Sequence, residues 1–438
     1  MSDILSILKS ITDLVTPCGI TFTGYFVKPS NNICFFGRVK IDDLRKLNSS
    51  NTITLSGKVN EQDVYIQSAE IIKEHPVGFN SEWMPVHIFP WEIVIGVQSP
   101  EHLSTVVRIN AVMPELNWFF PKPSFASLES DKITFKFPEI KMSATCYGKQ
   151  ISLARSCEFE ESASQSALTY INNIELTVHE PIAINQAINE LACIRYFFCF
   201  LADDGVPLPS SFSFCASGSG ASNDNNTEKH IWLNDNHTYR MQKKEWPFRI
   251  RYDDIKKEFN AVLNKRMSFW KNKHNHLIIE LFNGIICMKS IGLNRFLNLC
   301  QALEVYSTQY RNAEAKHVWE ADKGRSRNTT LYHRLIDIFC YHNDVFQRSN
   351  EEITEICRKI SDARNYYTHY TTSYREKYDD IRAICMDLDS VLHFLLLATV
   401  YKEMGIQTDV IQAALQDSTF RFGVPSAQLF ECLDNGEN

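Results

Sequence analysis

Short apolar runs, broken by turn residues, alternate along the first 180 residues. The runs are rich in β-branched and aromatic side chains, and breakers such as KPSNN and NSSN separate several of them. Runs of this length and spacing predict strands of an antiparallel β-sandwich or barrel. The expected strands are GITFTGYFV, ICFFGRVKI, TITLSGKV, VYIQSAEII, EIVIGV, TVVRINAVM, KITFKF and YINNIELTVH.

The period of the pattern changes near residue 182. Residues 182–202 place apolar side chains at helical spacing and predict a mostly buried helix, and the small polar run at 216–226 predicts a flexible loop. Beyond about residue 250 the spacing is helical almost throughout, which predicts an α-helical bundle. Helices are expected near 252–270, 276–311, 329–343, 351–370, 376–404 and 408–416, with residues 312–328 as one of the connections.

These patterns together predict an α+β protein with several domains. A β-rich domain at 1–180 is followed by a connecting region at 181–275, which contains a helix, a flexible loop and a basic segment. A helical bundle then occupies 276–420. The total of 438 residues is long for a single core, which agrees with this division.

Composition narrows the class further. Hydrophobic residues make up 44% of the chain and charged residues 22%, as in a soluble globular protein. The net charge of −7 argues against a nucleic-acid coat over the whole surface, although a local basic patch stays open. No uncharged apolar run of 18 or more residues predicts a membrane span, and no secretion signal is expected. Thirteen cysteines without CxxC pairs favour a reducing cytoplasm.

The stretch SDARNYYTHY, residues 361–370, carries the strongest candidate chemistry. On a helix, Asn365 and His369 share one face, and Arg364 lies about 100° away with a side chain long enough to bend toward them. A histidine can transfer protons at neutral pH, and an arginine can hold a phosphate and stabilise its charge. Asn365 could orient the imidazole or bind a phosphate oxygen. RNA cleavage needs little more, and neither metal nor cofactor is required.

A single histidine does not easily supply both a general acid and a general base. Two copies that face each other across a two-fold axis would provide both groups, because such an interface places the same patch on both subunits. The spacing by itself is weak evidence, since an arginine five residues before a histidine recurs by chance. The same residues could instead form a polar seam in a packing interface.

The neighbourhood of the motif resembles the ApeA type of the HEPN family (higher eukaryotes and prokaryotes nucleotide-binding). The similar region spans about 281–404 and contains LNLCQALEVYS at 297–307, RNYYTH at 364–369 and then a long apolar helix. The β-rich half, with GITFTGYF followed by TITLSGKV, is similar to the N-terminal domain that accompanies such bundles.

The resemblance implies a metal-independent endoribonuclease that acts as a homodimer or a higher homo-oligomer. Arg364 and His369 match the catalytic pair of the family, Asn365 matches its polar neighbour, and Glu304 takes a supporting role beside them. The resemblance also implies a part in antiviral defence, with RNA such as tRNA as substrate and a phage-derived trigger. The two-part layout suggests that the β-rich half senses or binds something, and that this half or the linker helices restrain the nuclease. The alternative is a non-catalytic scaffold, whose bundle only dimerises or binds a ligand.

A basic segment at 240–276 offers a second RNA contact. It holds 11 basic residues against four acids, and aromatic residues are interleaved with them. A basic surface with stacking aromatics suits single-stranded RNA, whereas the competing interpretation is a solvated helix face with aromatics in the core. The candidate RNA-binding residues are Arg249, Arg251, Lys265, Arg266, Lys271 and Lys273.

Two further patterns favour structure over chemistry. The HNH triplet at 274–276 and Cys193, Cys199 and Cys215 lack a second ligand pair nearby, so core cysteines are more plausible than zinc. The paired acids of LADDG, 201–205, are expected to cap or turn a helix end. No phosphate-binding glycine loop and no nucleophile elbow is found.

Overall fold

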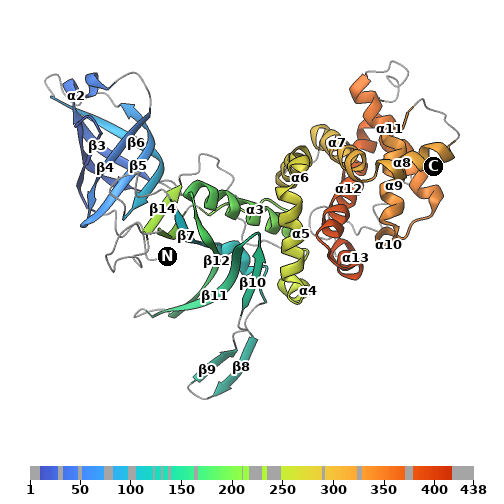
Figure 1. Cartoon of the computed structure of the whole chain (residues 1–438), viewed down its shortest axis with the longest axis horizontal. Helices are drawn as coiled ribbons and strands as arrows, with labels where there is room; N and C mark the ends of the chain where they lie inside the picture. The colour runs from blue at the N-terminus through green and yellow to red at the C-terminus, as the bar shows by residue number, and fades with distance from the viewer. Residues whose placement is uncertain are drawn as a thin grey trace. The chain divides into compact units, whose positions relative to one another are not determined.

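The computed structural model divides the chain into two compact units, coloured by residue number in Figure 1. Unit 1 comprises Met1–Pro114, Glu139–Ala192 and Pro207–Lys243, and unit 2 comprises Glu115–Pro138, Cys193–Val206 and Lys244–Asn438. The structure describes residues 10–27, 33–47, 52–73, 82–96, 105–121, 124–129, 132–136, 140–161, 166–209, 211–216, 229–233, 248–288, 292–322, 328–369 and 378–416.

Unit 1 begins with a closed six-stranded antiparallel barrel, as the sequence predicts. Each strand pairs with two neighbours in the order β1-β4-β5-β6-β3-β2, and β2 returns to β1. Closure leaves no free edge that could template aggregation. The strands are β1 (Thr12–Val15), β2 (Thr21–Val27), β3 (Cys34–Lys40), β4 (Thr52–Val59), β5 (Gln62–Lys73) and β6 (Trp83–Ile95). A short helix, α2 (Ile41–Lys46), follows β3.

Every second side chain along the strands points inward and fills the barrel. Inward positions such as Leu14, Phe22 and Phe35 are fully buried, and the rings of Phe26 and Phe35 meet edge to edge at a centroid distance of 5.2 Å. Gly24 of β2 lies opposite Gly37 of β3. A Cβ atom on Gly24 would lie 2.0 Å from a backbone oxygen, so only glycine allows the two strands to approach this closely.

Strand β6 also belongs to an open sheet of the same unit. Its order is β10-β11-β12-β7-β13-β14-β6, with every pair antiparallel. The added strands are β7 (Val106–Val112), β10 (Lys141–Cys146), β11 (Lys149–Glu161), β12 (Ser166–Ile182), β13 (Ser211–Ala216) and β14 (Lys229–Leu233). Strands β10 and β11 were not among the expected runs. The expected connecting region 181–275 also contains two strands of this sheet, β13 and β14, which the sequence analysis did not predict.

Unit 2 is mainly helical, and a two-stranded sheet belongs to it, β8 (Ser124–Glu129) with β9 (Lys132–Lys136). Its helices are α4 (Tyr252–Ile255), α5 (Phe259–Lys271), α6 (His276–Cys287), α7 (Leu293–Tyr310), α8 (Asn312–Ala321), α9 (Leu331–Tyr341), α10 (Asn343–Phe346), α11 (Asn350–His369), α12 (Tyr378–Glu403) and α13 (Thr408–Gln416). The helix α3 (Ile184–Ala202) is divided between the two units after residue 192. The predicted helix 276–311 is two helices, and the predicted connection 312–328 contains α8.

The central helix of unit 2 is α12, which packs against α7, α11 and α13. Its segment Ile381–Glu403 is long and apolar enough to cross a membrane, but 82% of the apolar window is buried inside the fold. The same helix buries Asp389 and His393. A core helix accounts for both observations, so hydrophobicity here reflects packing within the unit.

The barrel alternation predicts unequal effects from two adjacent phenylalanines. Phe35→Ala removes a fully buried ring and should cost about 3–5 kcal/mol of local stability. Phe36 lies on the outer face, so Phe36→Ala should cost no more than about 1 kcal/mol. Hydrogen exchange of barrel peptides measures both opening free energies. Equal loss of protection in the two variants would contradict the assigned inner and outer faces.

Candidate active site

The helix α11 presents the motif, and its sequence explains both its start and its orientation. Ser349 and Glu352 form a reciprocal cap, with the backbone N–H of each donating to the other's side chain at 2.7 and 3.2 Å. Ile353, Ile356 and Ile360 recur at helical spacing and are buried. Cys357 is buried on the same face, whereas Glu355 and Arg358 lie on the outward face, and the last turn of the helix carries the motif.

Arg364 is held from two directions. One guanidinium nitrogen lies 3.5 Å from a carboxylate oxygen of Glu304 on α7, and another donates to the side-chain oxygen of Asn365 at 3.3 Å. About a third of each side chain in the Arg364–Glu304 pair is exposed, at 29% and 34%. A half-exposed pair at this distance contributes little stability. Its effect is to orient the guanidinium while part of it stays accessible to an anion.

His369 is the last residue of α11 and is exposed. Among the described residues, no hydrogen bond or ion pair involves His369. Asn365 lies one helical turn before it. Tyr366 and Tyr367 are half-buried and meet edge to face at 5.1 Å. One chain thus brings Glu304, Arg364 and Asn365 together and leaves the imidazole free to approach a ligand.

Two cysteine side chains near this cluster, those of Cys300 and Cys385, are uncharged at neutral pH. Cys300 lies on α7 one turn before Glu304 and is buried. Burial raises the pKa of the Cys300 thiol well above its ordinary value, although the positive charge of Arg364 opposes the shift. Burial likewise raises the pKa of Cys385 on α12 to about 12. Both side chains stay protonated at neutral pH, so neither is an activated nucleophile.

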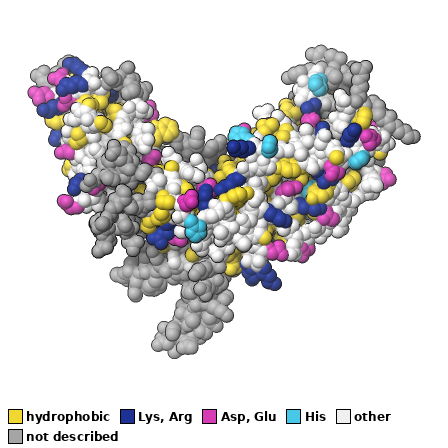
Figure 2. Space-filling view, viewed as in Figure 1, with side chains coloured by type: hydrophobic (Ala, Val, Ile, Leu, Met, Phe, Trp, Pro, Cys, Tyr) yellow, Lys and Arg dark blue, Asp and Glu magenta, His cyan; other side chains and the backbone are white. Residues whose placement is uncertain are grey.

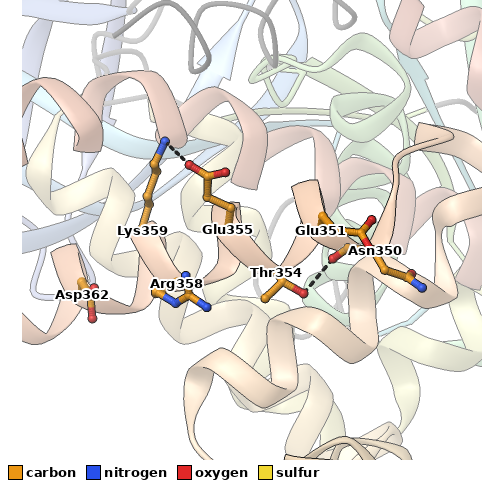
Figure 3. A pocket seen from close by; sticks show the side chains of 7 residues that line it. All are labelled: Asn350, Glu351, Thr354, Glu355, Arg358, Lys359 and Asp362. Carbon is orange, nitrogen blue, oxygen red and sulfur yellow. Dashed lines mark hydrogen bonds and ion pairs between the residues drawn. The ribbon is translucent and has the colours of Figure 1, made fainter. Parts of the chain in front are cut away.

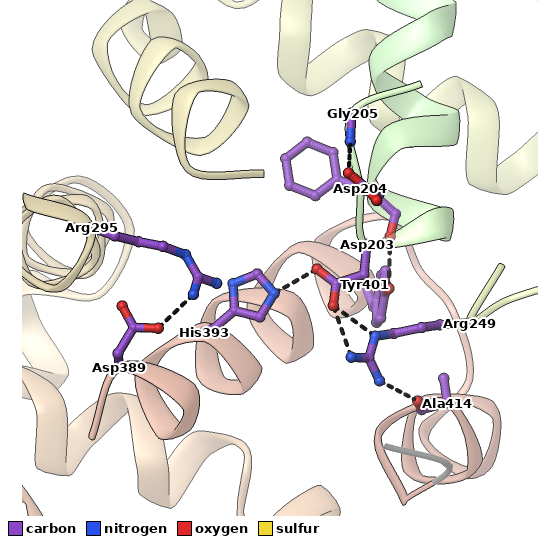
Figure 4. A network of polar contacts seen from close by, with 10 residues as sticks. Asp203, Asp204, Gly205, Arg249, Arg295, Asp389, His393, Tyr401 and Ala414 are labelled. Atoms are coloured by element: carbon purple, nitrogen blue, oxygen red, sulfur yellow. Dashed lines mark hydrogen bonds and ion pairs between the residues drawn. The ribbon is translucent and has the colours of Figure 1, made fainter. Parts of the chain in front are cut away.

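A buried polar network lies deeper between α7 and α12 (Figure 4). Arg295 of α7 is paired with Asp389 of α12 at 2.5 Å, and both side chains are almost fully buried. One turn further along α12, the imidazole Nε2 of His393 lies 2.5 Å from a carboxylate oxygen of Asp203. Asp203 also pairs with Arg249 at 2.8 Å. Two ion pairs and the His393–Asp203 hydrogen bond therefore join these segments in the core.

Asp203 shows what the sequence interpretation missed. Its backbone N–H does close a turn with Phe200, and its φ of 53° is left-handed, as expected for a residue at a helix end. Its carboxylate, however, is 3% exposed and forms the centre of the network. The signal was the pair of polar residues within the apolar α12, Asp389 and His393, since buried charges require partners.

The basic segment requires a correction. Arg249 is buried and paired with Asp203, and Arg266 is buried over the rings of Phe200 and Trp270 at 4.9 and 5.4 Å. Burial lowers the pKa of Arg266 to about 10, which still leaves it charged at neutral pH. The prediction that these two arginines bind RNA is therefore wrong.

The other four basic candidates stay predictions. Arg251, Lys265 and Lys273 are exposed, and Lys271 is half-exposed. On the face of unit 2 that Figure 2 shows, Lys and Arg side chains are interspersed with Asp and Glu. Phe248 and Phe259 are buried, which agrees with the interpretation that aromatics of the segment belong to the core.

A pocket of about 520 Å³ opens along the outward face of α11 (Figure 3). Its described lining runs from Asn350 to Asp362 and mixes both signs of charge, with Lys359 paired to Glu355 at 2.9 Å. Burial raises the pKa of Asp362, against the opposing charge of Arg358. The pocket ends one turn before Asn365, so the same helix face links it to the motif.

No metal centre is found in the described part of the chain, where no three His, Cys, Asp or Glu side chains form a metal-binding group. His276 pairs with Glu280 at 3.6 Å on the surface of α6. Cys193, Cys199 and Cys215 are buried.

Residues 297–410 match the family model of the Apea-like HEPN domain. The match includes Glu304, Arg364, Asn365 and His369, and it runs from within α7 to the start of α13. Searches of curated proteins and of solved structures each returned no match.

Two substitutions in α7 separate the roles of its ion pairs. Arg295→Met leaves Asp389 buried without its cation and should cost about 3–5 kcal/mol of stability. Glu304→Gln acts on a half-exposed pair and should cost less than about 1 kcal/mol. Denaturant unfolding, followed by near-ultraviolet circular dichroism, measures both. Comparable losses would contradict the distinction between a structural pair and an orienting pair.

Proposed function

We propose that this chain, whose residues 297–410 form an Apea-like HEPN domain, is a metal-independent endoribonuclease. The observation that carries the proposal is the pairing of a restrained arginine with an unrestrained histidine on one helix. Arg364 is held by Glu304 and Asn365, and His369 is exposed at the end of the same helix. Such an arrangement suits an anionic substrate that both groups approach together.

The proposed reaction is an internal transesterification. His369 of one subunit removes the proton of a ribose 2′-hydroxyl, and the 2′-oxygen attacks the adjacent phosphorus. The bond from phosphorus to the 5′-oxygen breaks, and a second histidine protonates that oxygen. Arg364 binds the non-bridging oxygens, on which negative charge increases. The products are a 2′,3′-cyclic phosphate and a 5′-hydroxyl.

The second histidine comes from a second copy of the chain. Each subunit supplies one histidine at this position, and a two-fold interface would place two such helix ends against each other. The composite site then contains Arg364, Asn365 and His369 from both subunits. Homodimerisation is thus part of the proposed mechanism.

The proposed setting is antiviral defence in the cytoplasm. Cellular RNA, with tRNA as a first candidate, would be the substrate, and a phage-derived molecule would be the trigger. Unit 1 would sense that trigger and restrain cleavage in its absence. The support for this setting is the domain family together with the two-unit organisation of the chain.

Substitution of the motif should abolish cleavage without unfolding the protein. His369→Ala and Arg364→Ala should each lower the rate of RNA cleavage at least about 100-fold, since each removes a group that acts on the transition state. The assay measures cleavage of purified total RNA in EDTA. Phage lysate is added in a parallel sample to supply the trigger.

Matched controls lie close by. Arg358→Ala removes an exposed arginine from the same helix, and His317→Ala removes an exposed histidine from α8. Both should cleave as the wild type does. If the motif variants changed melting or dimerisation while wild-type protein with lysate cut no RNA, the non-catalytic scaffold would be the better account.

A mixing experiment tests the composite site. Wild-type protein is mixed with increasing His369→Ala protein at constant total concentration and allowed to exchange subunits. If one site needs both histidines, the cleavage rate should fall with the square of the wild-type fraction. A linear fall would mean that each subunit cleaves alone and would contradict the composite site.

A further inference from the structure

Aromatic residues line the outer face of strand β6. Alternate residues of this strand, starting at Met84 and including the buried Val86 and Ile88, pack into the barrel core. The residues between them lie on the outer face and are half-buried or exposed. These outward residues are Trp83, Pro85, His87, Phe89 and Trp91. Outward positions of an antiparallel sheet are ordinarily polar, so this composition calls for an explanation other than folding.

A second row crosses the barrel at His87. Tyr25 of β2 lies opposite Phe36 of β3, Phe36 lies opposite His87, and His87 lies opposite Ile72 of β5. The ring centroids of Tyr25 and Phe36 are 6.3 Å apart at 18°, and those of Phe36 and His87 are 4.0 Å apart. Tyr25, Ile72 and Trp91 are each 48% exposed. We call the outward residues of β6, together with Tyr25, Phe36 and Ile72, the aromatic row.

Two exposed cations lie beside one end of the aromatic row. The guanidinium of Arg38 is 5.0 Å from the ring centroid of Trp83, and the ammonium of Lys40 is 5.8 Å from it. Acids are also present at the margin. Asp13 accepts a hydrogen bond from Thr23, and Glu70 lies opposite Phe89. A ligand that matches this surface therefore combines flat apolar faces with only a few negative charges.

The geometry points to a single-stranded nucleic acid, and we propose that the aromatic row stacks its bases while Arg38 and Lys40 bind its phosphates. Alternate side chains on a strand are about 6.8 Å apart, and the rings of His87 and Phe89 are 6.4 Å apart. Stacked bases are about 3.4 Å apart, so a ring inserted between two bases opens the step to about twice that distance. The centroid spacing along β6 is therefore close to that of a strand whose bases alternate with protein rings, and the 52° angle between His87 and Phe89 must close for one base to stack on both.

The arrangement of the rings favours this ligand over a protein partner. Four rings follow β6, those of Trp83, His87, Phe89 and Trp91, and Phe36 and Tyr25 continue the rings sideways from His87. A protein interface is instead a broad patch with a packed centre and a polar rim. Base stacking on aromatic side chains is also tolerant of sequence, as a track without hydrogen-bonding specificity requires. This binding does not depend on the proposed nuclease activity.

The test measures binding of the full chain to labelled oligonucleotides by fluorescence anisotropy. His369→Ala protein in EDTA is used so that RNA is not cut. The probes are RNA and DNA strands of identical sequence, about 16 nucleotides long, and the corresponding duplexes. Single strands should bind, with quenching of tryptophan fluorescence, and duplexes should bind at least about tenfold more weakly. The RNA and DNA arms show whether the sugar contributes.

Ring substitutions identify the surface. Tyr25→Ala and Trp91→Ala should each weaken binding about fivefold or more. Tyr25→Phe should bind like the parent protein, whereas Tyr25→Leu, which keeps apolar bulk without a ring, should not. The matched control is Tyr147→Ala, because Tyr147 is 58% exposed at the turn between β10 and β11.

The salt dependence of oligonucleotide affinity measures how much Arg38 and Lys40 contribute to binding. A single strand loses affinity with a slope of about −0.7 in log units for each neutralised phosphate, so Arg38 and Lys40 together should give about −1.4. Arg38→Ala combined with Lys40→Ala should flatten this slope. The proposal is overturned if single strands of both sugars fail to bind, if Tyr25→Leu binds as tightly as Tyr25→Phe, or if Tyr147→Ala loses as much affinity as Tyr25→Ala.

Discussion

The cost of burying charge determines how the helices of unit 2 fit together. Helix α12 carries Asp389, Ser390, His393 and Thr399 into the core, and an unpaired Asp389 carboxylate there would cost several kcal/mol. Arg295 of α7 pairs with Asp389, and Asp203, which follows α3, is in hydrogen-bond contact with His393. Because α7 is rigid, fixing Arg295 against α12 also fixes Glu304, about 13.5 Å further along the helix.

Glu304 in turn orients Arg364, the residue proposed to bind the phosphate. Its contact with Arg364 is long and half-exposed, so it supplies direction more than stability. The buried ion pairs hold the helices, and the surface pair orients the guanidinium. In the proposed reaction the exposed His369 would transfer protons. Because one ion pair of α7 is buried and the other is partly exposed, we expect them to contribute unequally to the free energy of unfolding.

Much of the architecture follows from local pattern, and the exceptions have physical causes. The alternation in TITLSGKV and the spacing in ICRKISDARNYYTH correctly predict a barrel strand and the helix of the motif, since each buries one continuous face. Strand β13 was missed because its pairing with β7 joins residues about a hundred positions apart. Arg249 and Arg266 were misassigned because composition does not distinguish a solvated cation from one buried beside Asp203 or over Phe200. A supporting role for Glu304 was expected without a definite partner, and the structure pairs it with Arg364, whereas the role of Asp203 needed three-dimensional contacts.

The two proposals assign different tasks to the two units. The barrel of unit 1 would bind single strands by stacking, with little charge and little sequence preference, and the helical unit would cleave RNA with arginine and histidine alone. Neither task requires the large basic surface that nucleic-acid-binding proteins often carry, which agrees with a net charge of −7.

The identity of the RNA ends tests the central claim most directly. Wild-type protein is incubated in EDTA with total RNA, with and without phage lysate, and the new termini are analysed chemically. The account predicts 2′,3′-cyclic phosphates and 5′-hydroxyls, because the 2′-oxygen is the nucleophile and no metal-bound water takes part. New termini with 3′-hydroxyls and 5′-phosphates, or cleavage that appears only when a divalent metal is restored, would contradict it.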